Sequence, residues 1–403
     1  MQVRNYIRNN WKKSVRIHNK MNNSIAVPFP YNSPCAEGLF DELYYWDTYF
    51  LNRGLLKDQL FEQAKNNILD ISYLISKYGF MPNANRLDMI NRSQPPFFIS
   101  MVIDYYNNTL DKSIFQSVIK SMNLEMEFWI KNRTVYIDNS LAFQYRSHAL
   151  DEHYIYMAKE YRERVKKIID ENEDDLIIGK NVLAECESGW DFSIRFNQRI
   201  LNYLPIDLNS MMYFNLTSLE QINRHFDYQS NYDYKAIAFN LLKTLNNKCY
   251  KDGIYYDYDF VNNKISSIIS MASFYPFKFN IYNDKKAFNY LYNKLIHQYG
   301  LSTTEKEDEH NYQWGYPNMW PCLMLIAFDG AINIKDDKKA IDIAKLYINT
   351  VDKEFARSNK LWEKYDVNIG TRSILNEYSE TEMLGWTAGS YVAMYDYLKE
   401  SNQ

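Results

Sequence analysis

The sequence predicts an all-α protein, and three observations support this fold class. Apolar residues recur at helical spacing along most of the chain. Glycine and proline, which interrupt helices, number only 12 and 10 in 403 residues. Strand-like alternation is confined to residues 253–263, which predicts one short β-hairpin. Strands do not alternate with helices, so a parallel sheet is not expected.

Helical segments are expected from end to end. The first covers residues 56–78, and Gly79 is placed to end it. Asp207 is expected to cap the helix that it opens. The other expected helices are residues 113–132, 151–170, 207–226, 232–247, 285–299, 320–331, 336–355 and 380–400. Because no linker rich in Pro, Gly or Ser separates them, we expect residues 1–403 to form a single closed domain, in which six helical hairpins would form a ring.

Composition argues against several functional classes. The formal net charge is −4 and no basic stripe is present, so a nucleic-acid partner is not expected. No apolar run reaches about 18 residues, and residues 1–20 are polar, so we expect a cytoplasmic protein that does not bind a membrane. The four cysteines lie far apart and the six histidines lack ligand spacing, so we expect no disulfide, no metal and no cofactor.

The loops between the expected helices are rich in aromatic and acidic residues, which is typical of a binding site. Such a mixture suits a sugar, because an aromatic ring packs on the apolar face of the sugar and carboxylates accept hydrogen bonds from its hydroxyls. The alternative is a helix start with a buried aromatic face for residues 40–50, a polar loop between helices for residues 81–96 and an N-cap aspartate for residues 187–195. Six segments have this character: residues 40–50, 81–96, 187–195, 313–320, 362–366 and 377–389.

Three acidic residues in these segments are candidates for catalysis. Asp191 lies between Trp190 and Phe192, which would partly desolvate it. Desolvation raises the pKa of a carboxyl group, as a general acid requires. Glu363 and Glu377 could activate a water molecule or bind hydroxyls, and a surface salt bridge is the alternative for each.

Taken together, the order and spacing of these segments resemble the trehalase family of inverting glycoside hydrolases. The similarity extends from about residue 35 to residue 395. The motifs that carry it are Tyr44-Tyr45-Trp46-Asp47, residues 82–96, Ser188-Gly189-Trp190-Asp191-Phe192-Ser193, residues 205–209, Gln313-Trp314, Glu363-Lys364-Tyr365 and residues 377–387.

The resemblance implies an (α/α)6 toroid, with the short β-hairpin as an insertion, and the hydrolysis of α,α-trehalose to two glucoses. It implies Asp191 as general acid and Glu363 as general base, with the carboxyl groups about 6.5–9.5 Å apart. It implies a small carbohydrate as the binding partner and no cofactor. The residues that it implies around the sugar are Phe40, Tyr44, Trp46, Asp47, Asn83, Arg92, Gln94, Glu152, Gly189, Trp314 and Glu377.

The chain departs from the family on the side that should hold the leaving glucose. Leu39 and Leu150 stand where the family has arginines, and Arg372 is a candidate to compensate for one of them. Two alternatives therefore stay open: a related inverting α-glucosidase acting on another glucoside, such as glucosylglycerate or an oligosaccharide, and a non-catalytic sugar-binding relative. Because Asp191 and Glu363 are both present, the second alternative is disfavoured.

Overall fold

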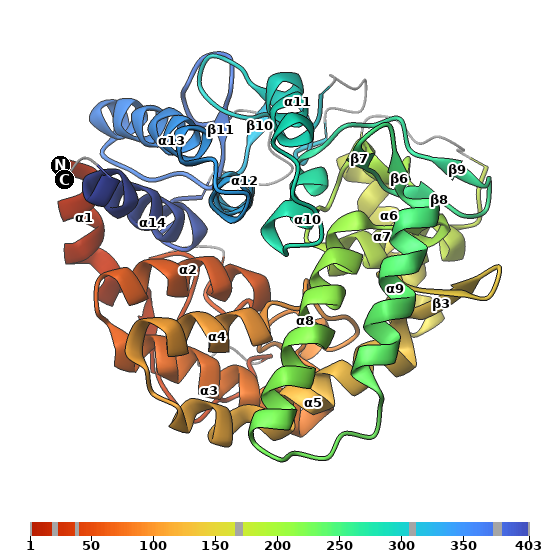
Figure 1. Cartoon of the computed structure of the whole chain (residues 1–403). Helices are drawn as coiled ribbons and strands as arrows, with labels where there is room; N and C mark the ends of the chain where they lie inside the picture. Colours follow the sequence, from red (N-terminus) through yellow and green to blue (C-terminus); the bar gives the residue numbers. More distant parts are fainter. Residues whose placement is uncertain are drawn as a thin grey trace.

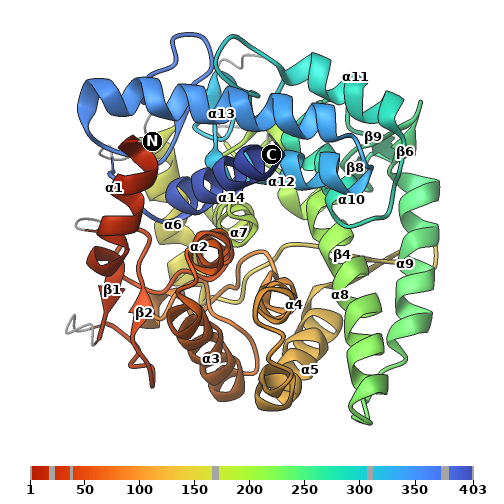
Figure 2. The ribbon, with the colours of Figure 1, turned by 60° about the vertical axis from the view of Figure 1, so that its left-hand side comes forward.

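The computed structural model of the chain describes residues 2–17, 23–36, 40–165, 172–305, 312–373 and 381–401. Its helices surround a common centre (Figures 1 and 2). The helices are α1 (Gln2–Asn10), α2 (Tyr45–Lys57), α3 (Phe61–Tyr78), α4 (Phe98–Thr109), α5 (Ser113–Arg133), α6 (Asp151–Arg164), α7 (Asp175–Ser188), α8 (Ile206–His225), α9 (Tyr234–Lys248), α10 (Tyr275–Lys278), α11 (Lys285–Leu295), α12 (Pro321–Asn333), α13 (Asp337–Ser358) and α14 (Trp386–Ser401).

An inner ring of helices closes on itself. Helices α2, α4, α8, α10, α12 and α14 contact one another in this order, and α14 returns to α2. Helices α3, α5, α9 and α13 pack outside this ring, and α6 packs on α7 beside it (Figure 1). The expected all-α toroid is therefore confirmed.

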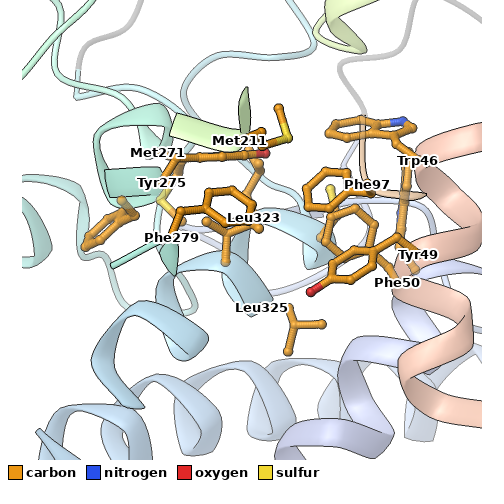
Figure 3. Packing of buried hydrophobic residues seen from close by; sticks show 14 of the residues in the cluster. Trp46, Tyr49, Phe50, Phe97, Met211, Met271, Tyr275, Phe279, Leu323 and Leu325 are labelled. Atoms are coloured by element: carbon orange, nitrogen blue, oxygen red, sulfur yellow. The ribbon is translucent and has the colours of Figure 1, made fainter. Parts of the chain in front are cut away.

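Helix α12 of the inner ring is buried on nearly every side because it is enclosed by the ring on one side and the outer helices on the other. In α12, residues 321–331 are all buried. Figure 3 shows the core from close by, where Trp46, Tyr49 and Phe50 of α2 approach Phe97. The rings of Tyr49 and Phe97 stack with their centres 4.4 Å apart. This packing fixes the start of α2, from which the cavity described below is built.

The strands are short, and every pairing among the described residues is antiparallel. The single hairpin expected at residues 253–263 is divided between two pairings, because β7 pairs with β6 whereas β8 pairs with β9 and β5. The strands are β1 (Val15–Arg16), β2 (Tyr31–Asn32), β3 (Thr134–Ile137), β4 (Ser140–Phe143), β5 (Tyr203–Leu204), β6 (Tyr250–Lys251), β7 (Ile254–Tyr255), β8 (Tyr258–Asp259), β9 (Lys264–Ile265), β10 (Asn318–Met319) and β11 (Tyr365–Asp366).

Several expected boundaries were wrong. The helix expected from residue 56 is two helices, because α2 ends at Lys57 and α3 begins at Phe61 after a turn. Asp207 does not cap its helix, since Pro205 is the capping residue and the Asp207 carboxylate pairs with Arg195. The last helix begins at residue 386 rather than 380. Gly79 ends α3 in the left-handed region with φ 82°, as predicted.

The crossing of α14 over α2 depends on glycine. A Cβ atom at Gly389 would lie 1.9 Å from the backbone oxygen of Phe50. We therefore expect Gly389→Ala to lower the free energy of unfolding by about 3 kcal/mol, the upper end of the usual cost of overpacking, in urea titrations followed by circular dichroism. Gly330→Ala in α12 is the matched control, because its Cβ would meet side-chain atoms no closer than 3.2 Å. An equal loss in both variants would contradict this explanation.

The described part of the chain contains no helix that is long and apolar enough to span a bilayer. All four cysteines are buried with free thiols. Burial raises the pKa of the Cys249 thiol well above its ordinary value, with a smaller contribution from the charge of Asp257. These thiols therefore stay protonated and act as small apolar groups in the packing.

Candidate active site

A cavity of about 500 Å³ lies next to the start of α2. Its floor is almost closed to solvent, since Trp46 is 2% and Asp47 is 6% exposed. Both predicted catalytic residues, Asp191 and Glu363, line it. Of the predicted binding residues, those that line the cavity are Phe40, Tyr44, Trp46, Asp47, Asn83, Arg92, Gln94, Gly189 and Trp314. Residues from both halves of the chain therefore meet in one place.

Two predicted binding residues are not placed in the cavity. Glu152 is exposed on the first turn of α6 and does not line it. Glu377 lies outside the described residues, as does Leu39. Leu150 precedes α6 with 77% of its surface exposed, and it is also absent from the lining. The suggested compensating residue Arg372 instead places its guanidinium over the ring of Trp362, 4.8 Å from the ring centre.

The structure adds cavity residues that were not predicted from the sequence. One face of α6 supplies five of the twelve, and its helical spacing would have revealed the face once one member was known. Six of them had been noted only as members of the segments 81–96, 313–320 and 377–389, and among these Arg86 belongs to the polar run expected to bind hydroxyls. The added residues are Arg86, Asp88, Met89, His153, Tyr156, Met157, Glu160, Arg164, Cys186, Gln313, Met383 and Trp386.

Tryptophan rings form the inner wall. The ring of Trp314 lies 5.6 Å from that of Trp46 and 5.5 Å from that of Trp190, and it stacks on Trp320 at 3.7 Å. Gly189 ends α7 with φ 74°, and a Cβ atom there would lie 2.8 Å from the Trp46 ring. Glycine is therefore required here by both the backbone conformation and the close approach of an aromatic ring.

The backbone around Asp191 is held on both sides. The Ser188 hydroxyl accepts a hydrogen bond from the amide of Trp190 at 3.1 Å. The Gln313 side-chain amide donates to the backbone oxygen of Asp191 at 2.8 Å, and the amide of Trp314 donates to the backbone oxygen of Phe192 at 3.1 Å. These bonds fix the peptide groups, so the Asp191 carboxyl group remains available to the cavity that it lines.

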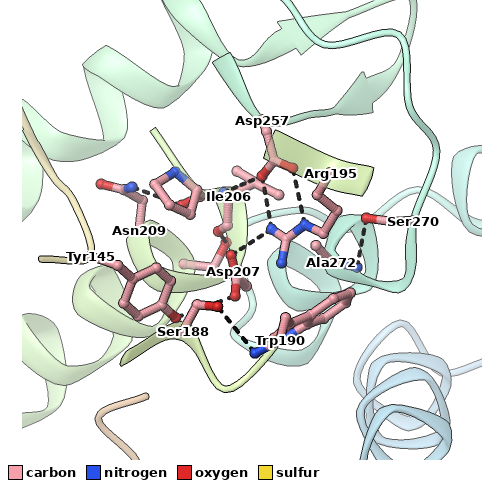
Figure 4. A network of polar contacts seen from close by, with 12 residues as sticks. Tyr145, Ser188, Trp190, Arg195, Ile206, Asp207, Asn209, Asp257, Ser270 and Ala272 are labelled. Atoms are coloured by element: carbon pink, nitrogen blue, oxygen red, sulfur yellow. Dashed lines mark hydrogen bonds and ion pairs between the residues drawn. The ribbon is translucent and has the colours of Figure 1, made fainter. Parts of the chain in front are cut away.

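A buried triad of charged residues, Arg195, Asp207 and Asp257, stabilises this loop (Figure 4). The Arg195 guanidinium is fully buried and donates to Asp207 at 2.7 Å and to Asp257 at 2.9 and 3.1 Å. It also lies over the ring of Trp190, 4.2 Å from the ring centre. Because buried charges are costly unless they are paired, this triad ties the loop that follows α7 to α8 and to the segment before β8.

The same glutamine connects the two catalytic segments. The Lys364 ammonium donates to Glu363 Oε2 at 2.9 Å and to Gln313 Oε1 at 3.2 Å. Since the Gln313 amide nitrogen also binds the Asp191 backbone, one side chain joins the candidate acid to the candidate base. The backbone oxygen of Glu363 accepts a hydrogen bond from the Trp386 indole at 3.0 Å. These bonds tie the backbone of Asp191 to the segment that carries Glu363.

Burial controls the protonation of the acidic side chains in the cavity. It raises the pKa of Asp191 to about 6; the positive charges of Arg92 and Arg164 oppose this rise, and Glu363 adds to it. It raises the pKa of Asp47 to about 8, again with help from the negative charges of Glu363 and Asp191. Asp191 can therefore hold a proton under weakly acidic conditions, as a general acid must.

This pKa predicts a pH dependence. A general acid works only while protonated and a general base only while ionised, so the profile should be bell-shaped, and on its alkaline side kcat/KM is expected to fall about tenfold per pH unit above about pH 6. The measurement is kcat/KM on a glucoside between about pH 4 and pH 9. Arg164→Ala removes one of the positive charges that lower the pKa of Asp191, so the alkaline limb of the pH profile of this variant should move to higher pH. An activity that stays constant through neutral pH would contradict the assignment of Asp191.

Comparison with known proteins identifies the family of this site. The family model described as trehalase matches residues 1–399. The chain belongs to the trehalase family. Trehalases from human and honeybee are 28% and 27% identical to it, over 89% and 94% of this chain. The chain spans only 66% and 64% of their lengths. A periplasmic trehalase from Xanthomonas axonopodis is 29% identical over 94% of this chain and 70% of its own length.

Solved structures show the same fold. The neutral trehalase of Saccharomyces cerevisiae superimposes with a TM-score of 0.77 at 20% identity, covering 98% of this chain and 80% of that one. A mannosylglycerate hydrolase from Thermus thermophilus, whose structure contains Tris and D-glycerate, superimposes with a TM-score of 0.66 at 12% identity. The match covers 98% of this chain and 100% of that one. The helical toroid is thus shared beyond the trehalase family, and the substrate must be argued from the cavity itself.

Proposed function

We propose that this protein is an inverting glycosidase that hydrolyses α,α-trehalose to two molecules of glucose. The observation that carries the proposal is that Asp191 and Glu363 line one cavity whose inner wall holds the predicted glucose-binding residues. The trehalases among its relatives support the choice of substrate. A purely sugar-binding role would not require an acid and a base facing the same space.

The reaction follows from these two groups. Asp191 gives its proton to the oxygen between the two sugars, and the bond from that oxygen to the anomeric carbon breaks. Glu363 takes a proton from a water molecule, whose oxygen bonds to the anomeric carbon from the opposite face. One product is therefore β-glucose and the other is α-glucose. The water must fit between the carboxyl groups, so a separation of about 6.5–9.5 Å is expected between them.

The test is to offer trehalose to the purified protein and to follow glucose by NMR before the anomers equilibrate. Equal initial amounts of α- and β-glucose are expected. Glucosylglycerate and maltose are offered in parallel at the same concentration. Release of glucose from one of these but not from trehalose would overturn the proposed substrate. Release of α-glucose alone from trehalose would overturn inversion.

A further inference from the structure

The cavity has a deep end and an outer end that differ in exposure. Trp46 and Asp47 at the floor are almost completely buried. At the outer end, the side chains of Glu160 and Arg164 are 35% and 43% exposed. A glycoside that enters a closed pocket places its transferred sugar at the floor, and the group that departs first lies towards the opening. The outer end is therefore the leaving-group side of the cavity.

One face of α6 forms this outer wall. Five of its residues, at spacings of three, one, three and four, line the cavity: His153, Tyr156, Met157, Glu160 and Arg164. A helix surface turned towards other protein is normally apolar, whereas this one carries an imidazole, a phenol, a carboxylate and a guanidinium. The face is thus equipped to bind a polar molecule rather than to pack.

The charges on the outer wall occur as neighbouring pairs. Arg164 lies 3.9 Å from Glu160, and Arg86 lies 2.8 Å from Asp88. A site for an anion presents cations without carboxylates beside them, because the carboxylates would repel the ligand. A sugar hydroxyl both donates and accepts, so a neighbouring donor and acceptor can bind adjacent hydroxyl groups. The paired charges therefore favour an uncharged ligand with many hydroxyls.

Arg164 also faces the reacting centre. Its positive charge acts on Asp191, where it opposes the rise in the pKa caused by burial. Arg164 and Asp191 also line the same cavity, so the guanidinium and the candidate acid can both meet a bound glycoside. Arg92, which also lines the cavity, acts on Asp191 in the same sense.

The geometry points to Arg164 and Glu160 as the residues that recognise the leaving group, an uncharged and hydroxyl-rich sugar, from the C-terminal end of α6. This rests on the proposed function and adds to it the specificity of the outer subsite. The loss of family arginines at Leu39 and Leu150 then need not remove recognition of the leaving sugar, because α6 supplies a guanidinium of its own.

The test compares two substrates that share the transferred glucose. α,α-Trehalose has a leaving sugar, whereas α-glucosyl fluoride has only fluoride. For Arg164→Ala we expect kcat/KM on trehalose to fall about ten- to a hundredfold, and on the fluoride to change by less than about threefold. For Arg164→Lys and Glu160→Gln, we expect values of kcat/KM on trehalose between those of Arg164→Ala and the wild type. Lys159→Ala, exposed on α6 outside the cavity, is the matched control and should match the wild type on both.

Three results would overturn the inference. Equal losses on both substrates would place Arg164 at the transferred glucose or in folding, which circular dichroism checks. Unchanged kcat/KM on trehalose would remove Arg164 from recognition. A wild-type preference for the anionic glucosylglycerate over trehalose would show that the outer wall selects a charged group, while leaving the acid–base chemistry intact. If the wild type hydrolysed none of these glucosides, the proposed function itself would fail, and the inference with it.

Discussion

Replacing Asp191 with asparagine is expected to lower kcat for trehalose by about 10²- to 10⁴-fold, the usual contribution of a general acid. Asparagine keeps the size of the side chain but has no proton to transfer to the departing oxygen. The hydrogen bonds made by the Asp191 carbonyl and by the Trp190 amide do not involve the carboxyl group, so the loop should keep its position. Glucose release measures the loss, and far-ultraviolet circular dichroism measures the fold.

The Asp191→Asn variant should lose much less activity on a substrate whose leaving group departs without being protonated. Fluoride departs with far less acid assistance than a sugar, so hydrolysis of α-glucosyl fluoride should suffer much less than hydrolysis of trehalose. Asp151→Asn, exposed on the first turn of α6 and outside the cavity, is the matched control. Near wild-type turnover of trehalose by Asp191→Asn would show that another group supplies the proton.

Replacing Glu363 with alanine is expected to cause a second large loss of turnover. Without a base the attacking water is not deprotonated, and kcat should again fall by about 10²- to 10⁴-fold on trehalose and on α-glucosyl fluoride alike. Loss on both substrates separates the base from the acid, because every substrate needs the attacking water. Glucose release and fluoride release are the two measurements.

Azide provides a positive test of this role. Added azide can occupy the space left by the Glu363 carboxylate and attack the anomeric carbon without a base, as fluoride departs from α-glucosyl fluoride. The expected product is β-glucosyl azide, which NMR identifies. Glu62→Ala, exposed on α3, is the control and should show no azide effect. Near-full activity of Glu363→Ala would make the base assignment wrong, and Glu377 would become the next candidate.

The deep end of the cavity could be predicted from the sequence because its residues lie in short contiguous motifs. Trp46 and Asp47 fall in the first turn of α2, and Asp191 follows directly after α7. Motifs of this kind keep their order and spacing when the helices around them change. The predicted roles of Asp191 and Glu363 remain predictions until the variants are measured, as does the expected cytoplasmic location.

The outer wall could not be predicted in the same way. Its residues are spread over α6 at helical spacing, with apolar and charged neighbours between them, so no compact motif marks them. Glu152 illustrates this, since the sequence pointed to Glu152 whereas the neighbouring His153 is the residue that lines the cavity. The predicted helix cap at Asp207 is wrong for a related reason. The Asp207 carboxylate pairs with Arg195, which lies in another part of the chain, and so does not bind the backbone at the start of its helix.

The aromatic wall gives the protein a built-in optical reporter. Five of its eight tryptophans, Trp46, Trp190, Trp314, Trp320 and Trp386, are in ring contact with one another. Three of these, Trp46, Trp314 and Trp386, line the cavity directly. A sugar that displaces water from these three indoles changes the polarity around three of the eight tryptophans. Intrinsic fluorescence can therefore follow sugar binding without a label, even in a variant that no longer turns over.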